Sequence, residues 1–169
     1  MGAKNSGTFI YYNSFSTCRR EPTKVTLTND RPKEKEANGM ARSKIEDGKV
    51  LVADDDESMR ELVVDVLEST GYSVIATANG MEAIRVFKER KNEICLVILD
   101  RKMPEMNGDD AFRAMKTAGL NVPLLISSGS SKGEKELIDE GVAGFIMKPY
   151  RIDELIEKIK SALENQKKG

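Results

Sequence analysis

The stretch ICLVILDRKMP, residues 94–104, decides the fold, because six apolar residues in a row lead directly to the carboxylate of Asp100. An uninterrupted apolar run of this length predicts a strand that helices cover on both faces, as happens in parallel sheets. Open α/β sheets carry their ligand chemistry just beyond the carboxyl ends of the strands. Asp100 is therefore the first candidate site residue.

Three more apolar runs stop at polar residues of other kinds. Residues 50–53 precede Asp54, Asp55 and Asp56, residues 122–126 precede Ser127 and Ser128, and residues 145–147 precede Lys148. Carboxylates crowded at one sheet edge repel one another unless a cation relieves the repulsion, and hard oxygen ligands suit Mg²⁺. With a hydroxyl and an ammonium beside them, these carboxylates predict a site that handles a phosphoryl group.

Strand-like and helix-like patterns alternate through residues 48–166. Strands are predicted at residues 50–53, 73–77, 94–99, 122–126 and 142–147, with a helix after each. The first helix carries an apolar stripe at residues 59, 62, 63, 66 and 67, and the last carries one at residues 152, 155, 156, 159 and 163. Gly71 is predicted to end the first helix, and Asn79 to cap the second.

Five strand–helix repeats predict an α/β fold with a doubly wound, flavodoxin-like parallel sheet and helices on both faces. With right-handed crossovers the expected strand order is 2-1-3-4-5. The topological switch then lies between the first and third strands. We therefore expect Asp54 and Asp55 to become neighbours of Asp100.

The chain divides near residue 48. Residues 1–47 carry nine basic and six acidic side chains, two prolines and no sustained periodicity. They predict a disordered or weakly ordered N-terminal extension, because such a composition buries too little apolar surface to offset the entropy of ordering. Residues 48–166 are the predicted domain and residues 167–169 a short tail. No DNA-binding or catalytic domain is expected after it.

Several classes of function are excluded by what the sequence lacks. It contains no His, which excludes a Ser-His-Asp or Cys-His nucleophile, a His-ligated zinc and a phosphohistidine of its own. The net charge is −1, and no long basic stretch indicates direct nucleic-acid binding. No apolar run approaches the ~20 residues of a membrane span. Cys95 lies inside an apolar run and predicts a buried, reduced thiol, which favours the cytoplasm.

Residues 49–165 resemble the receiver domain of two-component response regulators, most of all the receivers attached to hybrid sensor kinases. The motifs that carry this resemblance are VLVADDDE at 50–57, LDRKMPEMNG at 99–108, SSG at 127–129 and GFIMKPY at 144–150. The resemblance implies that Asp100 is the phosphoacceptor. It also implies that Asp54, Asp55, Asp100 and the backbone carbonyl of Lys102 hold Mg²⁺, for which Mn²⁺ could substitute, and that the peptide bond before Pro149 is cis.

The same resemblance implies how the site works and with which partners. Lys148 and Ser128 would contact the phosphoryl group, and Ser128 and Phe145 would be switch residues that both move inward. The phosphoryl group would come from a histidine kinase or a histidine phosphotransfer protein. The chain would assist its own phosphorylation and dephosphorylation but would not be an enzyme acting on a separate substrate. Its output would pass through the fourth helix, fifth strand and last helix to a downstream protein or a second copy of the chain.

Two alternatives compete with this interpretation. Residues 54–58 also fit the D-x-D-x-[ST] pattern of haloacid-dehalogenase-like phosphohydrolases, in which Asp54 would be the nucleophile and Asp56 the acid or base. Against that alternative, no acidic pair follows a strand beyond Lys148, and no segment could form a cap domain. A degenerate receiver that only binds partners is disfavoured, because no active-site position is missing. The third acid, Asp56, and the cation of Lys102 depart from the usual family pattern.

Overall fold

The computed structural model describes residues 48–166, which form a parallel five-stranded sheet in the order β2-β1-β3-β4-β5. The strands are β1 (Lys49–Ala53), β2 (Ser73–Thr77), β3 (Ile94–Asp100), β4 (Leu124–Ser128) and β5 (Gly144–Met147). The helices are α1 (Glu57–Ser69), α2 (Gly80–Arg90), α3 (Gly108–Thr117), α4 (Glu134–Glu140) and α5 (Ile152–Gln166), with a short 3-10 helix at Lys91–Glu93. The predicted fold class and strand order are confirmed. The predicted extension at residues 1–47 and the tail at 167–169 lie outside the described residues.

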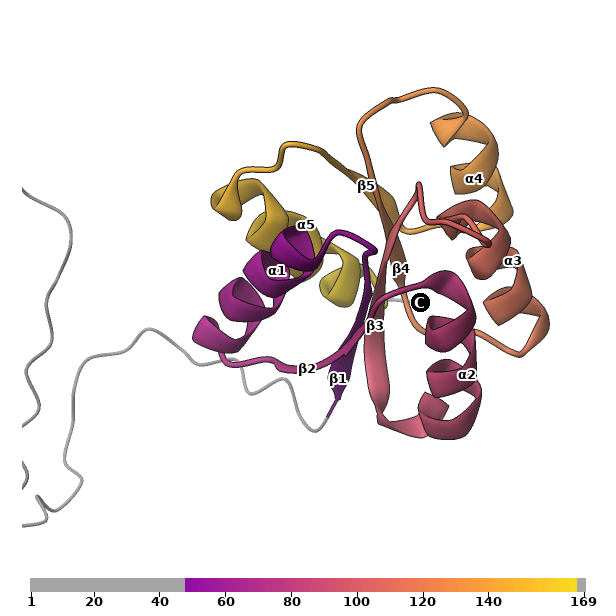
Figure 1. The fold of residues 1–169 in the computed structure, drawn as a ribbon, viewed down its shortest axis with the longest axis horizontal. Helices are drawn as coiled ribbons and strands as arrows, with labels where there is room; N and C mark the ends of the chain where they lie inside the picture. The colour runs from indigo at the N-terminus through magenta and orange to yellow at the C-terminus, as the bar shows by residue number, and fades with distance from the viewer. Residues whose placement is uncertain (1–47, 167–169) are drawn as a thin grey trace, which may run out of the picture. The chain divides into compact units, whose positions relative to one another are not determined.

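The helices cover both faces of the sheet, with α1 and α5 on one side and α2, α3 and α4 on the other (Figure 1). The side chains of β3 belong to the core on both faces of the sheet. Leu96 and Ile98 pack towards α1 and α5. Val97 and Leu99 pack towards α2 and α3. Successive side chains of a strand point to opposite faces, so a central strand in such a sheet must be apolar throughout. None of the helices within residues 48–166 is long and apolar enough to cross a membrane.

Three helices begin at the edge of the sheet where the strands end, and each is capped by a short polar side chain. Asp56 accepts a hydrogen bond from the Met59 amide, Asn79 from the Glu82 amide and Asn107 from the Asp110 amide. Side chains of this type satisfy amides that a helix N-terminus leaves without partners. The cap predicted at Asn79 is confirmed. Gly71 follows α1 with a φ of +93°, the left-handed conformation expected of a residue that ends a helix.

Some predicted boundaries and apolar stripes differ from the structure. β4 begins at Leu124 and not at 122, and it includes both serines, while β5 begins at Gly144 and not at 142. The stripe of α5 is wrong at Ile152, which is 52% exposed, because the core side of that helix runs through Leu155, Ile159 and Ala162. Ile152 is the first residue of the helix and lies before the turn that packs on the sheet.

Candidate phosphoacceptor site

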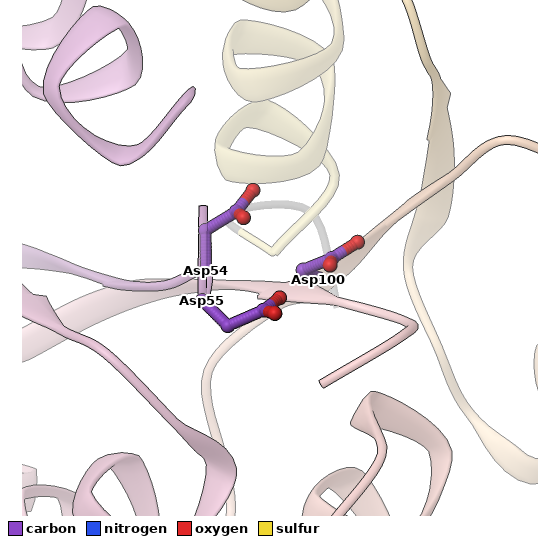
Figure 2. Close-up of side chains that lie close together, drawn as sticks. All are labelled: Asp54, Asp55 and Asp100. Carbon is purple, nitrogen blue, oxygen red and sulfur yellow. The ribbon is translucent and has the colours of Figure 1, made fainter. Parts of the chain in front are cut away.

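The predicted carboxylate cluster is formed where β1 and β3 end side by side. Ala53 and Leu99 are register partners, so Asp54 and Asp100 follow at the same edge of the sheet. One carboxylate oxygen from each of Asp54, Asp55 and Asp100 lies within 4.8 Å of the others. Figure 2 shows these side chains grouped beyond the ends of the two strands. Asp54 and Asp100 are buried, while Asp55 is exposed to solvent.

Lys148 reaches the cluster from the end of β5. Its Nζ lies 2.8 Å from Oδ2 of Asp54 and 3.0 Å from Oδ1 of Asp100. Its backbone amide donates to the carbonyl of Ser128 at 2.8 Å, which fixes this residue against β4. The Lys148–Pro149 peptide bond is cis, as the resemblance implied. A single ammonium therefore bridges the two buried carboxylates.

The electrostatics of the cluster leave it short of positive charge. Burial raises the pKa of Asp100 above its usual value, and the hydrogen bond from Lys148 offsets only part of that effect. Burial would lower the pKa of Lys148, but its hydrogen bonds to Asp54 and Asp100 outweigh burial and raise the pKa, so Lys148 stays charged. Three carboxylates thus face one paired ammonium. The uncompensated charge and the hard oxygen donors both fit a divalent cation such as Mg²⁺.

The third acid, Asp56, has a structural role. Its side chain caps α1, and its own amide donates to Oδ1 of Asp54 at 3.0 Å. This arrangement holds the Asp54 carboxylate in place and occupies the carboxylate that the phosphohydrolase alternative would use as its acid or base. Arg60, which sequence reasoning missed, adds a second support by donating to the Asp54 carbonyl at 2.7 Å. No spacing rule marks Arg60, because its partner is a backbone atom.

Ser128 lies at the end of β4 and is buried, but its hydroxyl does not contact the acceptor. Its Oγ donates to the carbonyl of Ser130 at 2.8 Å and accepts from the Ser130 amide at 3.2 Å. The hydroxyl is therefore held by its own loop. A phosphoryl group at Asp100 would have to draw it out of these bonds.

Phe145 and Lys102 are the remaining residues to which the resemblance gives a role. Phe145 is 9% exposed and belongs to the same core cluster as Ile126 and Leu137, and its role as a switch residue stays a prediction. Lys102 is exposed, and its side chain forms no hydrogen bond or ion pair with any residue in the range 48–166. Its backbone amide instead supports the Asp100 carboxylate.

Gly108 brings α3 against the acceptor strand. A Cβ at this position would overlap the Asp100 carbonyl and lie 3.0 Å from Cα of Arg101. The Gly108 amide also donates to the Arg101 carbonyl at 3.0 Å. The absence of a side chain therefore allows the helix to begin directly beneath the acceptor.

We expect Gly108→Ala to lower the free energy of unfolding by about 2 kcal/mol, because the added methyl group must push backbone atoms apart. Urea denaturation of the two proteins measures this difference. Gly129→Ala is the matched control, since a Cβ there meets no atom within 4 Å. Equal stability of Gly108→Ala and wild type would show that the acceptor loop yields without strain.

Comparisons with known proteins agree with this geometry. The family model for the response regulator receiver domain matches residues 50–160. The chemotaxis protein CheY of Thermotoga maritima is 35% identical over 114 residues, which are 66% of this chain and 93% of that protein. The sensor kinase CckA of Brucella abortus is 30% identical over 119 residues, which are 69% of this chain but 13% of the kinase. The chain thus matches nearly all of one relative and a small part of another.

A solved structure shows the same arrangement of strands and helices. The CheX–CheY complex with BeF3 and Mg²⁺ from Borrelia burgdorferi contains a chain with a TM-score of 0.64 and 26% identity, covering 68% of this chain and 87% of that one. The phosphohydrolase alternative gains no support from any of these matches. The resemblance predicted from the motifs is confirmed, and this chain belongs to the receiver-domain family of two-component response regulators.

Proposed function

We propose that Asp100 accepts a phosphoryl group from a phosphohistidine on a partner histidine kinase or histidine phosphotransfer protein. The observation that carries this proposal is the bridge from Lys148 to both Asp54 and Asp100 inside a cluster of three carboxylates. The chain has no His, so the phosphohistidine has to come from another protein. The cytoplasm is the compartment that fits a partner of this kind and the free thiol of Cys95.

In the proposed reaction an oxygen of the Asp100 carboxylate forms a bond to phosphorus while the phosphorus–nitrogen bond of the donor breaks. The bonding electrons leave with the imidazole of the donor. The Lys148 ammonium lies where it can stabilise negative charge first on the carboxylate and then on the phosphoryl oxygens. Positioning and charge stabilisation of this kind are the main requirements of phosphoryl transfer. The chain's own residues therefore assist its phosphorylation, although no separate substrate is processed.

Asp54, Asp55 and Asp100, with the backbone carbonyl of Lys102, are the groups that would hold Mg²⁺ or Mn²⁺. When bound there, the ion would offset the negative charge of the phosphoryl oxygens. The CheY relative crystallised with BeF3 and Mg²⁺ supports this assignment. Among residues 48–166, Asp54, Asp55 and Asp100 are the one group of three such ligands that lies close enough together for a single ion.

The output surface that we propose lies between α4, β5 and α5. Ile138 and Met147 are exposed there, at 45% and 44%, beside a groove with a volume of about 510 Å³. Acidic side chains from α4 and α5 also line this groove, namely those of Glu134, Glu154 and Glu157. A groove lined by apolar side chains and by more carboxylates than ammonium groups fits a partner segment that combines apolar and basic side chains, on a downstream protein or on a second copy of the chain.

Ser128 is the residue that should connect the acceptor to this surface. A phosphoryl group offers its hydroxyl a stronger, charged acceptor than the Ser130 carbonyl that it now uses. With beryllofluoride as the phosphoryl analogue, backbone chemical shifts should change most from residue 128 through α4. Ser128→Ala should confine the changes to the Asp100 loop, while Ser128→Thr, which keeps a hydroxyl, should preserve them. If Ser128→Ala gave the wild-type pattern, the hydroxyl would have no part in the output.

The direct test of the proposed function is mass measurement after incubation with Mg²⁺ and acetyl phosphate. One phosphoryl group should be added, and the addition should require the metal. A protein that stays unmodified, or that releases phosphate from general phosphomonoesters, would contradict the proposal.

A further inference from the structure

We propose that Arg101, the residue after the acceptor, is a positioning residue that holds the β4–α4 loop where Ser128 is turned away from Asp100. This inference rests on the proposed role of Asp100 and adds the element that opposes the switch. It concerns a side chain to which neither the motifs nor the resemblance gives a role. The claim follows from the contacts of a single guanidinium.

The first set of contacts ties Arg101 to α3. Its Nε lies 3.1 and 3.2 Å from the two carboxylate oxygens of Asp109, and its Nη2 lies 3.0 Å from Oδ2. The side chains of Arg101 and Asp109 are 19% and 21% exposed, so water screens this pair only partly. A guanidinium held by two nitrogens on one carboxylate has a fixed plane. Its remaining nitrogen therefore points in one direction.

The second set of contacts is with the loop that leads from Ser128 to α4. Nη1 of Arg101 donates to the backbone carbonyl of Lys132. Nη2 lies against Gly133, where a Cβ would be 3.0 Å from it, and Gly133, with a φ of +76°, directly precedes α4. One side chain adjoining the acceptor thus joins the beginning of α3 to the end of the Ser128 loop.

These contacts restrain the loop at the end opposite Ser128. The Ser128 backbone is fixed in β4 by the Lys148 amide, and its hydroxyl is bonded to Ser130 within the loop. For the hydroxyl to turn towards a phosphoryl group on Asp100, residues 129–132 must rearrange between these two fixed ends. α4 has a single buried residue, Leu137, so apolar packing gives the helix little hold of its own. Polar contacts to Arg101 then set much of the loop's position.

The consequence is a shift in the balance of two loop arrangements. A contact present in only one state stabilises that state. It therefore weakens the binding of any ligand that requires the other state. We assign the Arg101–Lys132 bond to the phosphate-free arrangement, so removing it should favour the arrangement in which Ser128 contacts the phosphoryl group. Binding of the phosphoryl analogue should become tighter and not weaker, which is the opposite of what general damage beside the acceptor would do.

The experiment is a beryllofluoride titration with Mg²⁺ on the full chain, comparing wild type with Arg101→Gln. We expect the apparent Kd to fall by about fivefold in the variant, because the loop no longer has to break a charge-assisted bond. Arg101→Lys keeps the charge but cannot bind Asp109 and the Lys132 carbonyl at the same time. Its apparent Kd should lie between those of wild type and Arg101→Gln. In the ligand-free proteins, amide hydrogen exchange at residues 130–134 should be faster in Arg101→Gln than in wild type.

Two comparisons separate this role from simple loosening of α4. Arg113→Gln removes the bidentate bond to Glu140 at the other end of the same helix, and it should leave the beryllofluoride Kd within about twofold. Combining Arg101→Gln with Ser128→Ala should abolish the gain in beryllofluoride affinity, since the released loop then has no hydroxyl to contact the phosphoryl analogue. An equal gain in Arg113→Gln, a gain that survives without Ser128, or unchanged exchange at residues 130–134 would overturn the proposal.

Failure of the proposed function has a different signature. In that case wild type and Asp100→Asn would bind beryllofluoride with the same affinity. The proposed role of Arg101 would then be overturned as well, because it depends on Asp100 being the acceptor. If instead wild type binds through Asp100 and Arg101→Gln binds equally or more weakly, only the role of Arg101 is overturned.

Discussion

Asp100→Asn should abolish phosphorylation by acetyl phosphate, because an amide cannot form the acyl phosphate that we assign to this position. Asp54→Asn keeps the acceptor but removes a buried carboxylate that we assign to the metal site, and it should slow the reaction by about tenfold or more. The measurement is the fraction of protein that gains one phosphoryl group over time in the presence of Mg²⁺. Asp65→Asn, at an exposed position of α1, is the matched control and should react as wild type does. Modification that persists in Asp100→Asn would remove the basis of the account.

Asp100→Asn should also be more stable than wild type in metal-free buffer. The pKa of Asp100 is raised, chiefly by burial, so its ionisation is harder in the folded chain than in the unfolded one. The free energy of unfolding of the wild-type protein should therefore fall as the pH rises from the ordinary carboxyl pKa through the raised pKa. Asp100→Asn should not show this decrease, because its side chain does not ionise. We expect Asp100→Asn to be more stable than wild type at pH 7 and to differ little from it at pH 4. An asparagine variant that is less stable than wild type at pH 7 would show that the ion pair with Lys148 outweighs the penalty of burial.

Lys148→Met should have the largest effect on stability. It removes the ammonium shared by Asp54 and Asp100 and leaves two buried carboxylates without an ion-pair partner. Loss of one partner from a buried ion pair is strongly destabilising, and we expect the free energy of unfolding at pH 7 to fall by about 3 kcal/mol. Lys160→Met, at an exposed position of α5, is the control and should stay within about 0.5 kcal/mol of wild type.

Two further measurements distinguish charge from packing in this variant. Lowering the pH should shrink the loss, because protonated carboxylates need no counter-ion, and millimolar Mg²⁺ should recover part of it by binding the folded state. Phosphorylation should also slow, since no ammonium remains to follow the charge onto the phosphoryl oxygens. A loss of stability that is the same at pH 4 and pH 7, with or without Mg²⁺, would mean that the methylene stem of Lys148 and not its charge holds the site together.

The sequence predicts most of the scaffold because its signals are local or follow from topology. The apolar run before Asp100 and the cap at Asn79 depend only on near neighbours. The proximity of Asp54 to Asp100 follows from the strand order, in which parallel strands from distant parts of the chain end at one edge. The family motifs could be recognised for the same reason: they occupy fixed places relative to those strands.

Other features depend on partners that no spacing rule specifies. The capping role of Asp56 is masked in the sequence by its two acidic neighbours. The contacts of Arg101 need the β4–α4 loop to return beside β3, and one of them is to a backbone carbonyl, which has no sequence signature. The burial of Phe145 depends on a core cluster that also contains Ile126 of β4 and Leu137 of α4. The folded structure is therefore needed to find the contacts of these residues.

The central claim is that Asp100 and no other carboxylate receives the phosphoryl group. Its most direct test is reduction of the acetyl phosphate-treated wild-type protein with borohydride, which converts an aspartyl phosphate to homoserine, followed by peptide mass spectrometry. The account predicts homoserine at position 100 alone, and only when Mg²⁺ was present during the reaction. Homoserine at position 54, the nucleophile of the phosphohydrolase alternative, would contradict it.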